Sequence, residues 1–336
     1  MNHVIKKERF FLNIKIPTYW ILITSLIFFI LINSIFSKLK TADASSIIIA
    51  KTKCKEPLTV LRENDYKLIH PILLADVKGE DKKYNQLKET ISGFIENIKK
   101  SGTITSASVY FSALNDGSHF SVNQEQEYSL NQLLRIGKTI TLLKQGENDP
   151  SFLDRQIIYK GLTPSTSGMI VNQSYSVKDL INRMIAQNDE CVKDLLNPLV
   201  DLKIYKSVYE AIQNPFPNLP NKNYKMNVCE YSKFLKLFYN GGFLSMKNSE
   251  FMLQLLTLNN FKNGITKDID KNIKVSHFYC KNEDGTTKQL HEFGIIYLTN
   301  KPYLLGIMTE GRNTDKQSYI IAEISKMVYI EMSKAI

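Results

Sequence analysis

Eighteen consecutive residues near the N-terminus, Tyr19 to Phe36, carry no charged side chain. As a helix this run would be about 27 Å long at about 1.5 Å per residue, close to the hydrocarbon thickness of a bilayer. Tyr19 and Trp20 stand at one end, where aromatic rings favour the membrane interface. We therefore expect residues 19–36 to form a single transmembrane helix that anchors the protein.

Basic residues are distributed unevenly around this run. Residues 1–40 hold six Lys and Arg and one acidic residue, and four of the six precede the run. Because the more positive flank stays in the cytoplasm, we expect residues 1–18 to be cytoplasmic and the bulk of the chain to lie outside the cell membrane. The alternative is a cleaved signal peptide with a cleavage site at Ala42 to Ala44, although the apolar run is long for one.

The composition excludes several classes of protein. Of the 336 residues, 43% are hydrophobic, which is typical of a globular chain and not of a disordered one. The net charge is +10, but half of it lies in residues 1–40, and the remainder shows no basic and aromatic stripe. We therefore expect no nucleic-acid partner. The four cysteines form no Cys-x-x-Cys pair and the five histidines no His-x-x-x-His pair, so we expect no metal site and no cofactor.

The apolar periodicity after a linker over residues 37–65 predicts one domain over 66–334. It indicates a helix over residues 81–100, a strand hairpin over 107–123 and a helical block over 130–258. Three strands over 273–308 and a last helix over 315–333 follow. Within the block, helices are expected over 130–143, 177–196 and 228–239. This order favours an α/β (α+β) fold: an antiparallel five-stranded sheet flanked by the N- and C-terminal helices, with an inserted helical subdomain. The sheet part would span about 66–129 and 270–334, and the helical part about 130–269.

Several local strings give this pattern a family resemblance. They are Ser108 to Gly117, Tyr128 to Arg135, Met184 to Glu190, Gln289 to Tyr297 and Pro302 to Thr309. Together they resemble the hairpin, the nucleophile helix, the second motif and the last two strands of the class A β-lactamase-like family of serine hydrolases and penicillin-binding domains. The resemblance covers about residues 66–334 and implies the fold of that family.

The resemblance also identifies the positions of the family's catalytic groups. Catalysis in the family needs a Ser-x-x-Lys pair, in which the lysine helps to activate the serine. The matching positions hold Gln132 and Arg135. A glutamine amide is not a nucleophile, and an arginine stays protonated and cannot accept a proton. Both changes remove the first step of the reaction.

The other two motifs are altered as well. The Ser-Asp-Asn motif is replaced by Asn188, Asp189 and Glu190, and the Lys-Thr-Gly motif by Phe278, Tyr279 and Cys280. The resemblance implies a mainly structural role for Asp189. The loss of the lysine removes recognition of a substrate carboxylate, and we expect Phe278 to crowd the pocket mouth.

Other reactive groups offer weaker alternatives. Glu210, four residues before Asn214, matches the spacing of the family's deacylating glutamate, but it also fits a helix surface. Among the cysteines, Cys280 should lie on the opposite strand face from His277. Cys191 should lie on a helix and pack as a small apolar residue. A Cys191–Cys229 disulfide is one open pairing.

Two hypotheses follow. The first is a membrane-anchored, extracytoplasmic β-lactamase-like domain that is a pseudoenzyme in serine hydrolase chemistry and binds cell-wall peptide, glycan or another envelope protein. The second is an active hydrolase of β-lactams or peptidoglycan peptides with an unrecognised nucleophile. An acid–base pair of Asp189 and Glu190 is one form of the second hypothesis. If these residues share a pocket with Arg135, we expect a structural salt-bridge network instead.

Overall fold

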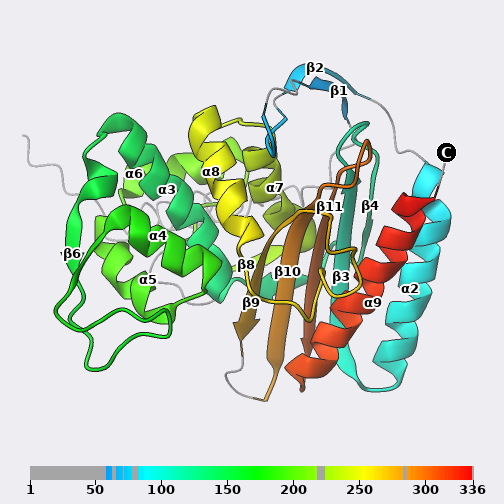
Figure 1. The fold of residues 1–336 in the computed structure, drawn as a ribbon. Helices are drawn as coiled ribbons and strands as arrows, with labels where there is room; N and C mark the ends of the chain where they lie inside the picture. The colour runs from blue at the N-terminus through cyan, green and yellow to red at the C-terminus, as the bar shows by residue number, and fades with distance from the viewer. Residues whose placement is uncertain are drawn as a thin grey trace, which may run out of the picture. The chain divides into compact units, whose positions relative to one another are not determined.

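A central antiparallel sheet organises the protein (Figure 1). The computed structural model describes residues 58–62, 66–70, 72–77, 82–217, 224–282 and 286–334, all within one unit, Cys54–Ile336. The expected transmembrane run 19–36 and the cytoplasmic segment 1–18 lie outside these residues. Among the helices of the described ranges, none has both the length and the apolar character needed to cross a membrane.

The five strands of the sheet have the order β4-β3-β11-β10-β9, and every neighbouring pair is antiparallel. They are β3 (Ile104–Ala113), β4 (His119–Val122), β9 (Val275–Asn282), β10 (Lys288–Ile296) and β11 (Tyr303–Gly311). The predicted five-stranded antiparallel sheet is therefore confirmed. The first hairpin and the last three strands are far apart in the sequence, and the pairing of β3 with β11 joins them.

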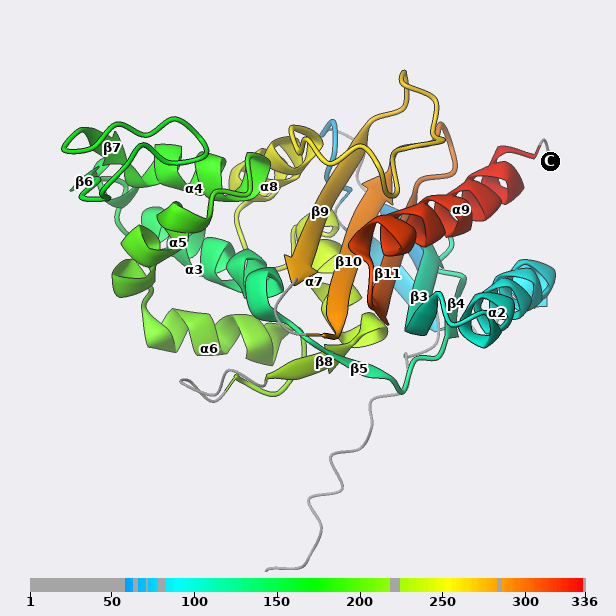
Figure 2. The same cartoon turned by 90° about the horizontal axis from the view of Figure 1, so that it is seen from below.

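Two helices cover one face of the sheet. They are α2 (Asn85–Lys100) and α9 (Thr314–Ser333), which lie side by side in Figures 1 and 2. In α2 the buried residues Leu87, Ile91 and Ile95 recur at a spacing of four, so they form one apolar stripe that faces the sheet. The helix ends at Gly102, whose φ of +73° is readily adopted by glycine.

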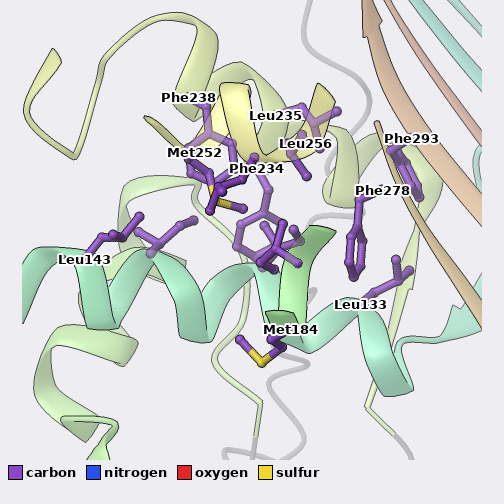
Figure 3. Packing of buried hydrophobic residues seen from close by; sticks show 14 of the residues in the cluster. Leu133, Leu143, Met184, Phe234, Leu235, Phe238, Met252, Leu256, Phe278 and Phe293 are labelled. Carbon is purple, nitrogen blue, oxygen red and sulfur yellow. The ribbon is translucent and has the colours of Figure 1, made fainter. Parts of the chain in front are cut away.

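The helical block covers the other face. It contains α3 (Leu134–Asn148), α4 (Val177–Ala186), α5 (Glu190–Leu196), α6 (Leu202–Ala211), α7 (Val228–Tyr239) and α8 (Met246–Thr257). Helix α7 contacts β3, β10 and β11, and α8 contacts β9. A capping box between Asn227 and Glu230 sets the start of α7 at the predicted position. Figure 3 shows part of the apolar core between the helices and the sheet.

Two expectations about element boundaries were wrong. The periodicity predicts one helix over 177–196, but the chain forms α4 and α5, separated at Asn188. Asn188 has a φ of +52°, a left-handed conformation that ends a helix, and Asp189 then caps the next one. In addition, the segment expected as a linker contains β1 (Leu58–Arg62), which pairs antiparallel with β2 (Ile72–Val77).

Short paired strands complete the described part. Strand β5 (Glu127–Ser129) pairs with β8 (Lys225–Asn227), and β6 (Gln156–Ile158) pairs with β7 (Ser174–Ser176). The β5–β8 pair lies between the sheet part and the helical block (Figure 2), and α3 and α7 begin beyond its two strands. This pairing helps to fix the start of α3, where the serine position of the family lies.

Candidate functional site

Gln132 is the residue that the sequence resemblance places at the position of the family's serine. It lies in a 3-10 turn, Asn131–Leu133, that leads directly into α3. This turn contacts β9, so the start of α3 and the edge strand meet there as the resemblance implies. The side-chain nitrogen Nε2 of Gln132 donates a hydrogen bond to the carboxylate of Glu190. The serine position therefore holds an amide that is already bound to a protein group and has no nucleophilic atom.

Arg135, which the resemblance places at the lysine position, lies in the first turn of α3. Its side chain is only 1% exposed, and its guanidinium forms an ion pair with Glu190. The nitrogen Nη1 also donates a hydrogen bond of 2.6 Å to Oδ1 of Asn188. Gln132, Arg135, Asn188 and Glu190 thus form one polar cluster between α3 and the start of α5. We name these four residues the Arg135 cluster.

Within the Arg135 cluster, the amide nitrogen of Gln132 and the guanidinium of Arg135 are bound to other protein groups. Oε1 of Gln132 and Nε of Arg135 are buried without a hydrogen-bond partner among the described residues. Because the guanidinium is charged at every physiological pH, it cannot act as a base, and its charge is compensated by Glu190. The side chain of Glu190 is 52% exposed, so the cluster reaches the surface through this carboxylate. The arrangement can hold α3 and α5 together and can present a polar surface, but it supplies no activated nucleophile.

Asp189 does not join this cluster. It is fully buried and caps α5, where Oδ1 accepts the backbone N–H of Cys191 at 2.9 Å. Its other oxygen, Oδ2, accepts both the backbone N–H and the hydroxyl of Ser167, at 3.0 and 2.5 Å. Asp189 therefore ties the loop around Ser167 to α5. Of the expected salt-bridge network of Asp189, Glu190 and Arg135, only the ion pair between Glu190 and Arg135 is present.

The environment of Asp189 favours its ionised form. Burial by itself would raise the pKa of this carboxyl group. Hydrogen bonds from Ser165, Ser167 and the backbone N–H of Cys191 outweigh burial, so the pKa lies below its ordinary value of 3.8. A carboxylate with a lowered pKa and saturated oxygens is a poor proton carrier at neutral pH, which argues against an acid–base pair of Asp189 and Glu190.

The residues of the third motif position face different sides of β9. Phe278 is fully buried in the core on the helical side, near Leu133 and Phe293 (Figure 3). Tyr279 faces the other side and stacks on Phe261, with ring centroids 4.3 Å apart. The expectation that Phe278 crowds the pocket mouth was wrong in its detail, because the ring is part of the core. The strand therefore holds an aromatic core residue at the position where the resemblance led us to look for the family's lysine.

Cys280 is also unsuited to nucleophilic chemistry. It is 1% exposed, and its thiol lies 3.8 Å from the carbonyl oxygen of Leu130. Burial raises the pKa of this thiol to about 11, so it stays protonated at neutral pH. His277 lies on the opposite face of the strand, where its Nδ1 is 2.7 Å from the carboxylate of Glu292. The two residues do not form a catalytic dyad.

The remaining candidates, Glu210, Cys191 and Cys229, are not part of the Arg135 cluster. Glu210 is exposed on α6 and pairs with Lys206 one turn earlier, as a helix-surface residue does. Cys191 is exposed and forms no disulfide, so the expectation that it packs as a small apolar residue was wrong. Cys229 is disulfide-bonded, and the pairing of Cys191 with Cys229 is therefore excluded.

Sequence reasoning did not identify two residues around the site. Ser167 binds Asp189 across 22 positions of sequence, and no local pattern predicts such a contact. Lys138 follows Arg135 by three residues on α3, and this spacing places it on the same side of the helix. Burial, together with the positive charges of Lys193 and Arg135, lowers the pKa of Lys138. Its ammonium donates a hydrogen bond of 2.6 Å to Oδ1 of Asn197.

In the part of the chain that the structure describes, no group of three or more His, Cys, Asp or Glu side chains could hold a metal ion. The polar side chains of the Arg135 cluster bind one another, and the strand beside them presents a buried phenylalanine and a buried thiol. The site is therefore defined by contacts within the protein at positions where the resembled enzymes have reactive groups.

Comparison with known proteins agrees with this geometry at the level of fold. A model of the beta-lactamase enzyme family matches residues 86–332, and the chain belongs to that family. The resemblance on which the sequence analysis relied is thereby confirmed. No curated protein sequence matches the chain.

Solved structures with a similar fold include β-lactamases and a penicillin-binding protein. The TLA-1 extended spectrum β-lactamase is 16% identical with a TM-score of 0.63, and the match covers 73% of this chain and 99% of that one. A class A β-lactamase from Bacteroides cellulosilyticus DSM 14838 is 16% identical, with a TM-score of 0.62 and coverages of 73% and 97%. A point mutant of PBP-A, in an acyl-enzyme complex with penicillin G, is 15% identical, with a TM-score of 0.63 and coverages of 75% and 97%. At these identities the likeness establishes the fold and not the activity.

Proposed function

We propose that this protein is a membrane-anchored, extracytoplasmic member of the β-lactamase family that binds an envelope component and carries out no serine hydrolase chemistry. The anchor is the run 19–36, with residues 1–18 in the cytoplasm. The partner is cell-wall peptide, glycan or another envelope protein. The observation that carries the proposal is the Arg135 cluster, which fills the nucleophile and lysine positions with an amide and a buried, paired guanidinium.

Two further observations support the proposal. Phe278 fills the position of the carboxylate-binding lysine with a buried ring, so the cation that would hold a β-lactam or a peptide terminus is missing. Cys229 is disulfide-bonded, and structural disulfides persist in oxidising compartments outside the cytoplasm. The exposed carboxylate of Glu190 leaves a polar surface through which the former catalytic region could contact a partner.

The catalytic part is tested with the purified full chain in a mild detergent. We expect no covalent adduct after incubation with a fluorescent penicillin, by denaturing gel and intact mass, and no turnover of a chromogenic cephalosporin. An active class A β-lactamase in the same detergent is the positive control. An adduct of the mass of the opened β-lactam would overturn the proposal, and peptide mapping would then identify the nucleophile.

The location is tested with the exposed thiol of Cys191. A membrane-impermeant maleimide added to intact cells or spheroplasts should label the protein, and the label should be lost in the Cys191→Ser variant. The labelled protein should stay in the membrane fraction after an alkaline wash. Labelling only after lysis would contradict an extracytoplasmic domain, and release by the wash would favour the cleaved signal peptide.

A further inference from the structure

A cavity of about 680 Å³ lies beside the first residues of β9. Its walls come from α8, from the loop over residues 258–274 and from Lys67 and Leu68. Val275 and His277 line it from the start of β9, whereas Cys280 lies further along the strand and faces the Arg135 cluster side. The cavity is therefore separate from the candidate site. Its volume falls within the range of about 300–1,000 Å³ typical of pockets for small organic ligands.

The lining is rich in positive charge. Five lysines from two segments of the chain line the cavity: Lys67, Lys262, Lys267, Lys271 and Lys274. All five are exposed, and none of their ammonium groups forms an ion pair with a carboxylate of the described residues. A concentration of ammonium groups without carboxylate partners around one cavity raises the local potential and favours an anionic ligand.

Both acidic residues of the lining are already engaged with other protein groups. Oε2 of Glu250 accepts the backbone N–H groups of Leu68 and Ile69, at 2.9 and 3.1 Å. Oδ1 of Asp270 accepts the backbone N–H of Asn272 at 2.8 Å. These contacts hold the walls of the cavity together. Of the five lysines, Lys262 donates a hydrogen bond of 3.0 Å to the carbonyl oxygen of Asn259, and Lys267 lies over the ring of Tyr319. Lys67, Lys271 and Lys274 are the lysines left available to a ligand.

A buried histidine lies in the wall of the same cavity. His277 is 1% exposed, and its Nδ1 lies 2.7 Å from Oε1 of Glu292. Oε2 of Glu292 accepts the backbone N–H of Ile265 at 2.8 Å. Gly264 allows this approach, because a Cβ there would lie 1.8 Å from that oxygen. The ring of His277 is therefore held in place, and its Nε2 has no hydrogen-bond partner among the described residues.

We propose that this cavity binds a phosphate group carried on a larger organic body. The lining contains five lysines, and lysine binds a phosphate as a compact point charge. A phosphate monoester carries close to two negative charges at neutral pH, so it gains more from several ammonium groups than a singly charged carboxylate does. The volume exceeds that of a phosphate ion, which is why the ligand includes an organic part. This second site does not depend on the proposed function.

The test measures binding of sn-glycerol 3-phosphate, inorganic phosphate and acetate to the purified full chain in a zwitterionic detergent, by equilibrium dialysis at fixed ionic strength. Glycerol 3-phosphate should bind more tightly than acetate. The double variant Lys271→Gln with Lys274→Gln should weaken its binding at least about tenfold, because two close charges are lost. The control double variant Lys100→Gln with Lys203→Gln removes two exposed lysines outside the cavity and should leave the affinity within about twofold.

Vesicles of phosphatidylglycerol and of phosphatidylcholine distinguish the source of the phosphate. A preference for phosphatidylglycerol that the lysine pair controls indicates a lipid headgroup, and binding of glycerol 3-phosphate without that preference indicates a free ligand. Equal binding of acetate and phosphate probes, equal binding by the two double variants, or no binding of any phosphate probe would overturn the proposal.

Discussion

Replacing Phe278 by lysine, which restores the cation of the family's third motif, is expected to lower the free energy of unfolding by about 4 kcal/mol or more. Phe278 is fully buried between the helical block and the sheet. The substitution removes its packing against Leu133 and Phe293 and places an ammonium group in an apolar core (Figure 3). Urea unfolding of the purified chain, followed by circular dichroism, measures the change.

Two matched variants separate packing from charge. Phe278→Leu keeps an apolar side chain and should cost about 1 kcal/mol. Tyr279→Lys introduces the same charge on the neighbouring residue, which is half-buried on the opposite face, and should cost about 1–2 kcal/mol for the lost stacking on Phe261. If Phe278→Lys were as stable as the parent chain, the position would be open to solvent and a substrate anion could still be bound there.

The expected instability has a consequence for function. In the resembled enzymes, this position needs a charged side chain that reaches a substrate. Here the residue that the resemblance places at this position, Phe278, belongs to the core, so one residue both lacks the charge and fills the space. Restoring Ser-x-x-Lys at Gln132 and Arg135 alone would therefore leave the substrate without its anion site. The proposal that the protein binds a partner without hydrolysing it depends on the changes in both α3 and β9.

Most of the fold could be predicted because its signals are local. Short apolar runs mark the central strands, which are buried on both faces. An apolar spacing of three and four marks α2 and α7. The break between α4 and α5 falls at four polar residues, 187–190. Periodicity alone did not reveal it, because buried apolar residues resume at a helical spacing with Val192 and Leu196. The left-handed Asn188 and the capping carboxylate of Asp189 decide that boundary, and their effect depends on the contact with Ser167.

The candidate site was only partly predictable for a similar reason. Local strings allowed motif positions to be assigned to Gln132, Arg135 and residues 188–190. The structure brings four of these five residues together in the Arg135 cluster. The direction in which each side chain points depends on tertiary packing. For this reason the burial of Phe278 and the exposure of Cys191 differed from expectation.

Replacing Asp189 by alanine is expected to lower the free energy of unfolding by about 3 kcal/mol, which is the second large effect. The substitution removes the cap of α5 and leaves the N–H and hydroxyl of Ser167 without their acceptor. Asp194→Ala is the matched control, because Asp194 lies on the same helix with a side chain that is 78% exposed and should change stability by less than about 0.5 kcal/mol. Similar losses for both variants would show that the buried contacts contribute little.

The pH dependence provides a sharper test of the same contacts. Because hydrogen bonds hold the pKa of Asp189 below its ordinary value of 3.8, the ionised carboxylate stabilises the folded state. This contribution is complete above the pKa of the unfolded chain and is lost as the pH falls through the lower, folded pKa. The difference in unfolding free energy between the parent chain and Asp189→Asn should therefore be constant near neutral pH and shrink below about pH 4. A difference that stays constant down to about pH 2 would mean that the carboxylate charge is not what binds Ser167 and α5 together.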